Sequence, residues 1–318
     1  MDVSIVIVNY KTPILLRDCV KSIIDHSSGF DCEIIVVDNQ SEDESKSLVT
    51  SMFPSVKWID VGRNAGFGTA NNIGIKESKG EYTLLLNSDT ELYENAILKS
   101  LTHYKELAKK QEIGLLGCKV EHRNKDLQPS CNYYWAGIKE ELQANPIFIF
   151  IFQRLLKRKK LRDINKYERL NTNHAITWLG VPFALIKSSV IKSNLFDENF
   201  FMYSEDEELN FRLAKKGFKP FFYSETGIFH IIGGSSGDSS KRDRQIFASK
   251  LLFIFKAKGR GYFWVYSLIV KLNIKLDNAL NSSDKAFVEK NNLKLSWLKN
   301  YSKVILAKEF KVLNTYAD

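Results

Sequence analysis

Short apolar runs alternate with amphipathic segments along the first third of the chain. Four such runs occupy 4–8, 33–37, 56–60 and 83–86, and the first is rich in β-branched residues. Between the first two runs, residues 15–24 place apolar side chains at the spacing of one helix face. Strands that are almost wholly apolar and alternate with helices are typical of a parallel sheet covered on both faces. The pattern predicts an α/β fold whose central sheet is mostly parallel and flanked by helices.

Polar residues follow each of these runs. In sheets of this kind ligands bind beyond the carboxyl ends of the strands, so these positions are the first candidates for a site. They are Asn9, Tyr10, Asp38, Asn39, Arg63, Asn64, Asn87, Ser88 and Asp89. From position alone, Asp38 either accepts a hydrogen bond from a bound nucleoside or caps the helix that follows. Asp89 either helps to hold a divalent cation that binds a diphosphate, or belongs to a turn rich in Asn, Ser and Asp.

A glycine-rich turn precedes the helix predicted after residue 66. Gly66 and Gly68 allow the backbone to approach a ligand closely, and a helix N-terminus favours phosphate. The same glycines also suit a tight connection between a strand and a helix. The turn is not a dinucleotide-binding fingerprint, because Asn71 stands where that motif requires a third glycine. This departure counts against an oxidoreductase that uses a nucleotide cofactor.

Four consecutive acids, Glu205 to Glu208, open a predicted helix and follow a run of aromatic residues. Acids at a helix N-terminus are favoured by the helix dipole, and Glu208 can pair with Arg212 one turn later. This structural explanation accounts less well for Glu205 and Asp206, which adjoin the aromatic side chains. Burial beside them would raise a carboxyl pKa, which is the environment that a general base requires.

His230 lies in the apolar run 227–232, which leads into a stretch of glycines and serines. A lone histidine in such a run is commonly a buried, hydrogen-bonded residue. Its imidazole is also a good ligand for a divalent cation, so both interpretations stay open on the residues alone.

The positive charge of the chain is concentrated in its last quarter. Residues 241–318 carry 16 basic and 6 acidic side chains, whereas the whole chain has a net charge of +9. Two apolar, aromatic segments, 147–152 and 262–270, adjoin basic residues and are too short to span a bilayer. Each either lies in a membrane interface or docks on the protein core. Lysines among long aliphatic side chains suit an anionic membrane surface better than nucleic acid, for which the chain has no motif.

Cysteine usage and the N-terminus bear on the compartment. The four cysteines form no CxxC pair, which argues against a disulfide framework or a zinc site and fits a reducing environment. The N-terminus lacks the basic region of a signal peptide, and its apolar run has the length of a strand. We therefore expect a cytoplasmic protein, peripheral on the inner face of the plasma membrane.

The order and spacing of these signals resemble glycosyltransferase family 2, in particular the rhamnosyltransferase-like branch that builds bacterial surface polysaccharides. The matching segments are SIVIVNYKT, VVDNQSED, RNAGFGTANNIGI, LLLNSDTEL, FDENFFMYSEDEELNFRL and the histidine of IFHIIGGSS. They cover about 1–240. The resemblance implies a GT-A fold over 1–240, with a nucleotide-binding part at about 1–120 and an acceptor-binding part at about 121–240. A basic, helical and membrane-associated extension is expected over 241–318.

The resemblance also implies roles for individual residues. Asn9, Tyr10 and Asp38 would contact the base and ribose of the donor. Arg63 and Asn64 would lie near its ribose or diphosphate, and Asn87 and Ser88 belong to the same donor site. Asp89 matches the last acid of the family's DxD-type motif and would bind Mg²⁺ or Mn²⁺, with His230 as a further ligand. Asp206 matches the catalytic base. The candidate contacts for the acceptor sugar are Trp178, Tyr203 and Glu205, although Trp178 and Tyr203 are equally well explained as core residues.

The sequence departs from the family pattern at two of these positions. Asn87 stands where the fuller motif has its first acid, which points to a cation site that depends on the donor diphosphate and His230. Glu208 stands where relatives often have aspartate, which changes the reach of the side chain but not its charge.

The implied activity is that of an inverting, metal-dependent transferase. The donor would be dTDP-rhamnose or a UDP-sugar, and the acceptor a saccharide, with one linked to polyprenyl diphosphate as the expected form. An anionic membrane surface is the other expected partner, and nucleic acid is not; the sequence predicts no oligomeric state. The alternative is a non-catalytic, membrane-bound component of a polysaccharide assembly complex.

Overall fold

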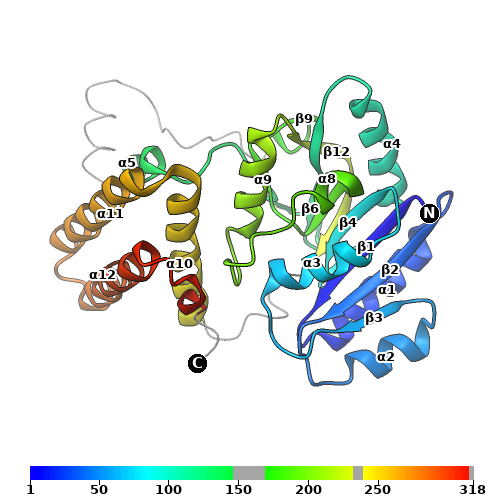
Figure 1. The fold of residues 1–318 in the computed structure, drawn as a ribbon, viewed down its shortest axis with the longest axis horizontal. Helices are drawn as coiled ribbons and strands as arrows, with labels where there is room; N and C mark the ends of the chain where they lie inside the picture. Colours follow the sequence, from blue (N-terminus) through cyan, green and yellow to red (C-terminus); the bar gives the residue numbers. More distant parts are fainter. Residues whose placement is uncertain (146–168, 232–238, 315–318) are drawn as a thin grey trace. The chain divides into compact units, whose positions relative to one another are not determined.

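The computed structural model describes residues 1–145, 169–231 and 239–314 (Figure 1). Contacts divide the described residues into two compact units. Among the described residues, the first unit draws on 1–134, 169–201 and 205–231, and the second on 135–145, 202–204 and 239–314. The apolar segment predicted at 147–152 lies outside the described residues.

The first unit is built around a ten-stranded sheet with the strand order β3-β2-β1-β4-β11-β6-β12-β5. Strands β1 to β4 run parallel, and β12 is parallel to β6. Strand β11 is antiparallel to both of its neighbours, and β5 is antiparallel to β12. These strands are β1 (Val3–Asn9), β2 (Cys32–Asp38), β3 (Lys57–Asp60), β4 (Tyr82–Asn87), β5 (Thr90–Leu92), β6 (Ile113–Glu121), β11 (Phe183–Lys187) and β12 (Lys219–His230). The four apolar runs of the first third therefore are parallel neighbours.

Short strands complete the first unit. Strand β7 (Leu127–Gln128) pairs with β6, and β9 (His174–Ala175) pairs with β12. A separate two-stranded sheet joins β8 (Cys131–Asn132) to β10 (Trp178–Leu179).

Helices cover both faces of the large sheet because its strands are apolar on both faces. Alternate side chains of β1 enter two different cores: Ile5 and Ile7 pack on one face, and Val6 and Val8 on the other. The first face is covered by α1 (Pro13–His26), α2 (Ser45–Met52) and α4 (Ala96–Ala108). The second is covered by α3 (Phe67–Glu77), α8 (Ser188–Lys192) and α9 (Glu205–Lys215). Each fully buried aliphatic side chain contributes about 1.5–3 kcal/mol relative to exposure.

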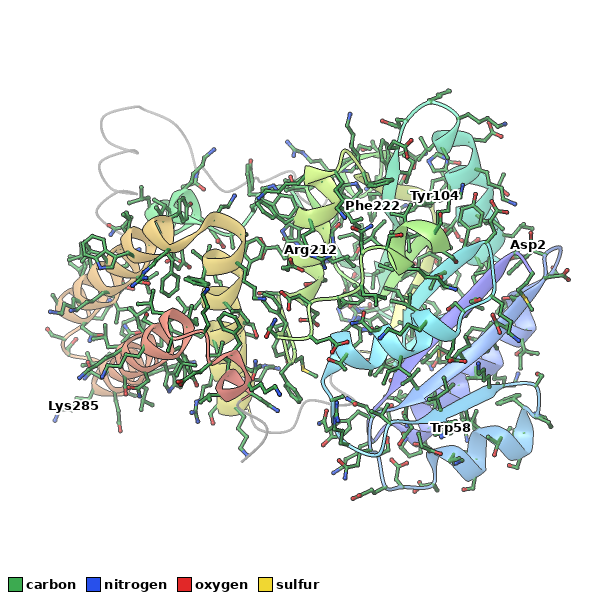
Figure 2. All side chains as sticks on the ribbon, in the orientation of Figure 1. Asp2, Trp58, Tyr104, Arg212, Phe222 and Lys285 are labelled. Atoms are coloured by element: carbon green, nitrogen blue, oxygen red, sulfur yellow. The ribbon has the colours of Figure 1, made fainter. Side chains whose placement is uncertain are left out.

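Large aromatic side chains fill both cores (Figure 2). Tyr104 of α4 is buried on one face, where its hydroxyl donates to the backbone O of Ile113 at 2.8 Å. Phe222 of β12 is buried on the other face. The hydrogen bond of Tyr104 removes the cost of burying an unpaired hydroxyl, so the ring ties α4 to the start of β6.

The second unit is helical. It contains α5 (Ile138–Ala144), α10 (Ser239–Lys258), α11 (Arg260–Leu280), α12 (Lys285–Leu306) and the 3-10 turn η1 (Phe310–Leu313). Helix α11 buries Phe263, Tyr266, Val270 and Ile274, which recur at intervals of three or four residues. Its opposite face leaves Trp264, Val265, Leu268 and Leu272 exposed. The predicted helical C-terminal region is confirmed, and none of the helices in the described ranges is long and apolar enough to cross a bilayer.

Candidate active site

The parallel strands bring most of the predicted site residues to one edge of the sheet. Because β1 to β4, β6 and β12 all point the same way, their carboxyl ends share that edge. Asn9, Asp38, Asn87 and His230 are the last residues of β1, β2, β4 and β12. Residues that are more than two hundred positions apart in the sequence therefore lie at the same edge of the sheet.

Asn9 and Asp38 form a buried hydrogen-bonded pair. Asn9 Nδ2 donates to Asp38 Oδ1 at 2.8 Å and to Ser41 Oγ at 2.9 Å, and Asn9 Oδ1 accepts from Thr12 Oγ1 at 2.9 Å. The other oxygen of Asp38 accepts from the backbone N of Ser41 at 3.0 Å. Asn9 has no exposed surface and both of its N–H groups are used. Its side chain thus orients the carboxylate of Asp38, which lines a pocket, rather than facing that pocket itself.

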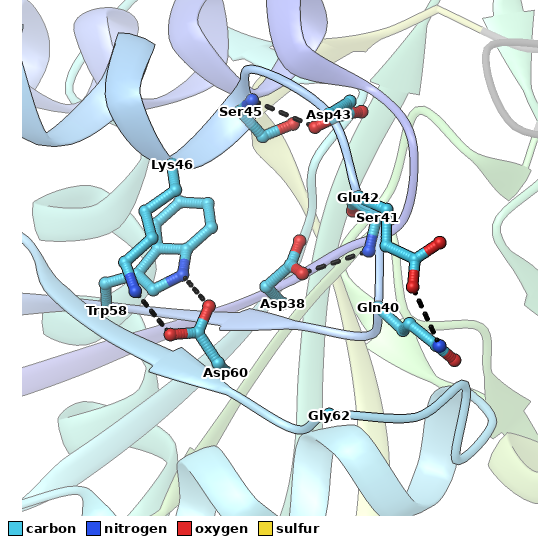
Figure 3. Close-up of a pocket in the computed structure, with 10 residues that line it drawn as sticks. All are labelled: Asp38, Gln40, Ser41, Glu42, Asp43, Ser45, Lys46, Trp58, Asp60 and Gly62. Carbon is cyan, nitrogen blue, oxygen red and sulfur yellow. Dashed lines mark hydrogen bonds and ion pairs between the residues drawn. The ribbon is translucent and has the colours of Figure 1, made fainter.

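This pocket has a volume of about 290 Å³ and lies between β2, β3 and the start of α2 (Figure 3). Trp58 Nε1 donates to Asp60 Oδ1 at 2.7 Å, and Lys46 pairs with the same carboxylate. The lining residues are Asp38, Gln40, Ser41, Glu42, Asp43, Ser45, Lys46, Trp58, Asp60 and Gly62. Four carboxylates outnumber one lysine in this lining, so its net negative charge repels a diphosphate. The carboxylates accept hydrogen bonds from the N–H and O–H groups of a nucleoside. Sequence reasoning missed the wall formed by Trp58 and Asp60, because it considered only the residues that follow each apolar run, and both lie within the run 56–60.

Two loops beside the pocket are locked together by amide side chains. Asn39 Nδ2 donates to Asn64 Oδ1 at 2.8 Å, and its Oδ1 accepts from the backbone N of Ala65 at 2.8 Å. Gln40 Oε1 accepts from the backbone N of Asn64 at 2.9 Å. Arg63 is exposed on the same loop, directly before Asn64. The side chain of Asn64 is thus engaged within the protein, and Arg63 is the cation that this loop presents to solvent.

Strained backbone accumulates in the loops after β1 and β2. Lys11, Gln40 and Glu42 have φ angles of 57°, 66° and 56°, which non-glycine residues rarely adopt. Such strain costs on the order of 1–3 kcal/mol per residue and concentrates at binding and catalytic sites. Tyr10 precedes the first of these residues and is half-buried.

The glycine-rich turn serves as a tight entry into α3. Gly66 has a φ of 86°, and the next residue, Phe67, donates its backbone N–H to Phe201 O at 2.9 Å. A Cβ on Gly66 would lie 2.3 Å from that same oxygen. Both the conformation and the close approach therefore require glycine at this position.

Gly66→Ala should lower the free energy of unfolding of the first unit by about 3 kcal/mol, the sum of backbone strain and a steric clash. Gly217→Ala is the matched control, because its φ is 91° and a Cβ there meets nothing within 4 Å. We expect Gly217→Ala to cost about 1 kcal/mol in urea unfolding. Equal losses of unfolding free energy for the two variants would mean that the backbone at Phe201 shifts away from the new Cβ at no energetic cost.

Asp89 and His230 form a pair that fits a divalent cation. Strand pairing sets Thr90 opposite His230, and Ile231 N donates to Asp89 O at 2.8 Å. His230 Nε2 then lies 3.2 Å from Asp89 Oδ1. Two neighbouring ligands of an octahedral ion at about 2.1 Å are about 3 Å apart, so this spacing suits Mg²⁺ or Mn²⁺.

The neighbours of Asp89 also bear on the cation. Asn87 Oδ1 is buried and has no hydrogen-bond partner, so an amide oxygen is left unsatisfied beside the pair. Ser88 Oγ lies 3.0 Å from Thr12 Oγ1, which links it to the Asn9 network. Within the described ranges, no three side chains of the types His, Cys, Asp and Glu come together as a metal site. Asp89 and His230 would thus supply two ligands of a cation, and a complete coordination shell would need further ligands from outside this pair.

Helix α9 opens with the carboxyl groups of Glu205, which is buried, and Asp206, which is half-buried. Burial raises the pKa of Asp206 to about 6, although the backbone N of Glu207 donates to its Oδ1 at 2.8 Å. Burial, and then the charge of Asp206, raise the pKa of Glu205 well above its ordinary value. Glu205 Oε2 is buried without a hydrogen-bond partner. Asp206 is the less buried of the two, which leaves it the better placed to meet a ligand.

A short segment connects this acid to the strand edge. A Cβ built on Gly180 would lie 3.6 Å from Asp206 Oδ2, and Pro182 O accepts from the backbone N of Asn87 at 3.2 Å. Asn210 of α9 donates to Leu179 O at 3.0 Å and so fixes the helix on β10. The carboxyl group of Asp206 and the end of β4 therefore lie at the two ends of residues 180–182.

The three candidate acceptor contacts differ in their burial and in the unit to which they belong. Trp178 of β10 is half-buried and its indole N–H donates to Tyr134 O at 3.1 Å. Tyr203 belongs to the second unit and has a φ of 66°. Glu205 is 5% exposed, so only a small part of its surface is accessible to a ligand.

Known proteins are similar to this chain in both sequence and fold. The family model described as Glycosyl transferase family 2 matches residues 4–165. The N-acetylglucosaminyl-diphospho-decaprenol L-rhamnosyltransferase of Mycobacterium tuberculosis is 24% identical over 220 residues, covering 64% of this chain and 68% of that protein. The mannosyltransferase of Pyrobaculum calidifontis, solved with GDP-Man and Mn²⁺, has a TM-score of 0.56 at 14% identity, over 96% of this chain and 86% of that one. Staphylococcus aureus TarS 1–349 in complex with UDP-GlcNAc has a TM-score of 0.55 at 14% identity, over 99% and 88%.

The chain belongs to glycosyl transferase family 2. Its fold is that of the GT-A transferases, with a mostly parallel sheet and a helical C-terminal region, as predicted. The family assignment was predicted from the ordered segments around the strand ends, and it is confirmed.

Proposed function

We propose that the chain is an inverting, metal-dependent glycosyltransferase that moves a sugar from a nucleotide-diphosphate donor to a saccharide acceptor in surface-polysaccharide synthesis. The observation that carries this proposal is the placement of the Asp206 carboxyl group, whose pKa is raised by burial, next to the sheet edge that also holds the Asp89 and His230 pair. A base of this kind and a cation site are the two elements that a single displacement needs. Residues 1–120 would bind the donor and 121–240 the acceptor.

The donor nucleoside would lie in the pocket beside Asp38, and Tyr10, the residue after β1, would be a further contact. The acidic lining suits a base and ribose, while Arg63 and Asn64 on the neighbouring loop would meet the ribose or diphosphate. We propose dTDP-rhamnose as the donor, on the likeness to a mycobacterial rhamnosyltransferase. A UDP-sugar is the alternative, supported by the UDP-GlcNAc complex of a protein with the same fold.

The chemistry follows from the placement of the two acids. Asp206 accepts the proton of the acceptor hydroxyl while that oxygen attacks the anomeric carbon on the face opposite the leaving diphosphate. One displacement inverts the anomeric configuration and needs no covalent intermediate. Asp89 and His230 would hold the cation, with Asn87 and Ser88 beside them. The cation supplies positive charge that offsets the charge developing on the diphosphate. Trp178 and Glu205 of the first unit would border the acceptor.

A transfer assay tests this function. Purified protein with Mn²⁺, either donor and a saccharide linked to polyprenyl diphosphate should yield one product whose new linkage has the inverted anomeric configuration by NMR. The lipid-linked acceptor is proposed because the mycobacterial relative is named for one. Absence of transfer from both donors would favour a non-catalytic component of an assembly complex.

The exposed face of α11 would hold the protein at an anionic membrane surface. Trp264, Leu268 and Leu272 follow one another at intervals of four residues and are 65%, 44% and 55% exposed. By helical spacing, the exposed side chains of Lys271 and Lys275 lie along the same face. An exposed apolar stripe flanked by lysines matches an interface rich in anionic lipid, and the basic excess of 241–318 adds long-range attraction. We propose the inner face of the plasma membrane as its site.

Replacing Leu268 and Leu272 together by serine should weaken binding to phosphatidylglycerol vesicles about tenfold or more in a sedimentation assay. Leu293→Ser is the matched control, since Leu293 is 52% exposed on α12 of the same unit. Full release of the wild type by high salt would show that charge alone holds the protein to the surface. Equal binding to neutral and anionic vesicles would contradict the role of the lysines.

A further inference from the structure

One glutamine holds His230 by both its backbone and its ring. Gln128, the last residue of β7, is buried, and its Nε2 donates to the backbone O of His230 at 2.7 Å. Its Oε1 lies 3.0 Å from Nδ1 of the same histidine. Its Nε2 is also 2.9 Å from Nδ1 of His122. A buried amide is costly unless it is hydrogen-bonded, and here both of its ends are engaged.

The direction of each bond follows from the backbone carbonyl. A carbonyl oxygen only accepts, so the end of Gln128 beside it must be the NH₂ group. The other end is then the oxygen, which accepts, and Nδ1 of His230 must carry the hydrogen. In a neutral imidazole this leaves Nε2 with its lone pair.

The nitrogen with the lone pair is the one that faces Asp89. His230 Nε2 and Asp89 Oδ1 are 3.2 Å apart, and both atoms are acceptors in this tautomer. Two acceptors at this distance repel each other unless positive charge lies between them. When the imidazole is neutral, the tautomer set by Gln128 therefore turns two acceptors toward the position that a cation would occupy.

We propose that Gln128 is a positioning residue that makes His230 a cation ligand by fixing its tautomer and ring orientation. This inference rests on the proposed function, in which Asp89 and His230 hold the cation. Loss of an outer partner of a metal-bound histidine weakens metal binding about 10–100-fold.

The experiment measures Mn²⁺ binding by calorimetry in the presence of saturating UDP or dTDP, whichever the wild type binds. Gln128→Met keeps the length of the side chain but removes both hydrogen-bonding ends, and it should weaken Mn²⁺ binding about 10–100-fold. His122→Ala is the matched control: it removes the other partner of the same amide, leaves both bonds to His230 and should bind Mn²⁺ like the wild type.

His230→Ala separates this inference from the proposed function. If His230→Ala leaves Mn²⁺ binding unchanged, the proposed cation site is wrong. If His230→Ala weakens binding but Gln128→Met does not, only the role of Gln128 is wrong. Adding Gln128→Met to His230→Ala should have no further effect, and an additional loss would show a merely structural role.

A second measurement needs no variant at position 128. In ¹⁵N-histidine-labelled wild type at pH 8 without cation, the resonances absent from His230→Ala should show Nδ1 protonated and Nε2 not. Protonation of Nε2 in place of Nδ1 would overturn the proposal.

Discussion

Asp206→Asn should lower kcat about 10³-fold while leaving nucleotide binding intact. The amide keeps the size of the side chain but cannot accept a proton, and general-base catalysis contributes about 10²–10⁴-fold. Because the effect falls on the chemical step, the affinity for the donor nucleotide should not change. The measurement is the initial rate of sugar transfer, with nucleotide binding followed separately by calorimetry.

The pKa of Asp206 makes the same variant informative about pH. With a pKa of about 6, the wild-type base is ionised above pH 6, so the rate should fall about tenfold per unit at lower pH. The residual activity of Asp206→Asn should lack this dependence. A wild-type profile that is flat from pH 7 down to pH 5 would contradict the assignment of Asp206 as the base.

Stability should move in the opposite direction to activity. Burial raises the pKa of Asp206 from 3.8 to about 6, so the folded state binds this proton more tightly than the unfolded chain does. The folded state therefore loses stability as the pH rises from about 4 to 6, and the loss is complete above pH 6. Asp206→Asn carries no charge and should be more stable than the wild type at pH 8, by on the order of 2 kcal/mol. The difference should vanish below pH 4.

A surface aspartate gives the matched control for both readouts. Asp25 lies exposed on α1, where it pairs with Lys21. Asp25→Asn makes the same chemical change. It should leave the transfer rate as in the wild type and change the free energy of unfolding by no more than about 0.5 kcal/mol. A stability gain at pH 8 for Asp25→Asn as large as that for Asp206→Asn would trace the effect to net charge rather than burial.

Local sequence patterns were sufficient to predict the site residues that lie at strand ends. Asp38 was predicted as a candidate because it follows an apolar run, and His230 because it is a polar residue within one. Burial on both faces makes such runs easy to recognise. Their partners depend on sheet order, which a local pattern does not contain. Gln128 meets His230 across 102 positions, and Thr12 meets Ser88 across 76.

The amide residues show a second limit of sequence reasoning. Asn9 was predicted to contact the nucleotide, and the structure buries it completely behind Asp38. The sequence pattern is the same for a polar strand-end residue that contacts a ligand and for one that only holds a neighbouring side chain in place. Which of the two applies depends on Ser41 and Thr12, which reach Asn9 from the loops after β2 and β1. The catalytic and binding roles of the strand-end residues stay predictions until variants are measured.

Asp89→Ala should abolish the metal dependence of nucleotide binding. In the wild type, dTDP or UDP should bind more tightly with Mn²⁺ than without it, because Asp89 and His230 would share the cation with the diphosphate. Removing a direct ligand should weaken binding with Mn²⁺ on the order of 100-fold, at least as much as the loss of an outer partner. Calorimetry of each nucleotide, with and without Mn²⁺, measures the effect.

Glu91→Gln provides the carboxylate control two residues away. Glu91 pairs with Arg123, so its neutralisation should leave the Mn²⁺ dependence as in the wild type. The nucleotide that the wild type prefers then selects between a dTDP-sugar and a UDP-sugar, because the two nucleotides differ in the base and in the 2′-hydroxyl of the ribose and share the diphosphate. If Asp89→Ala binds the nucleotide with undiminished Mn²⁺ dependence, the cation lies elsewhere along the sheet edge. If well-folded wild type binds neither nucleotide, the pocket beside Asp38 is not the site of either donor. A different nucleotide or a non-catalytic role must then be considered.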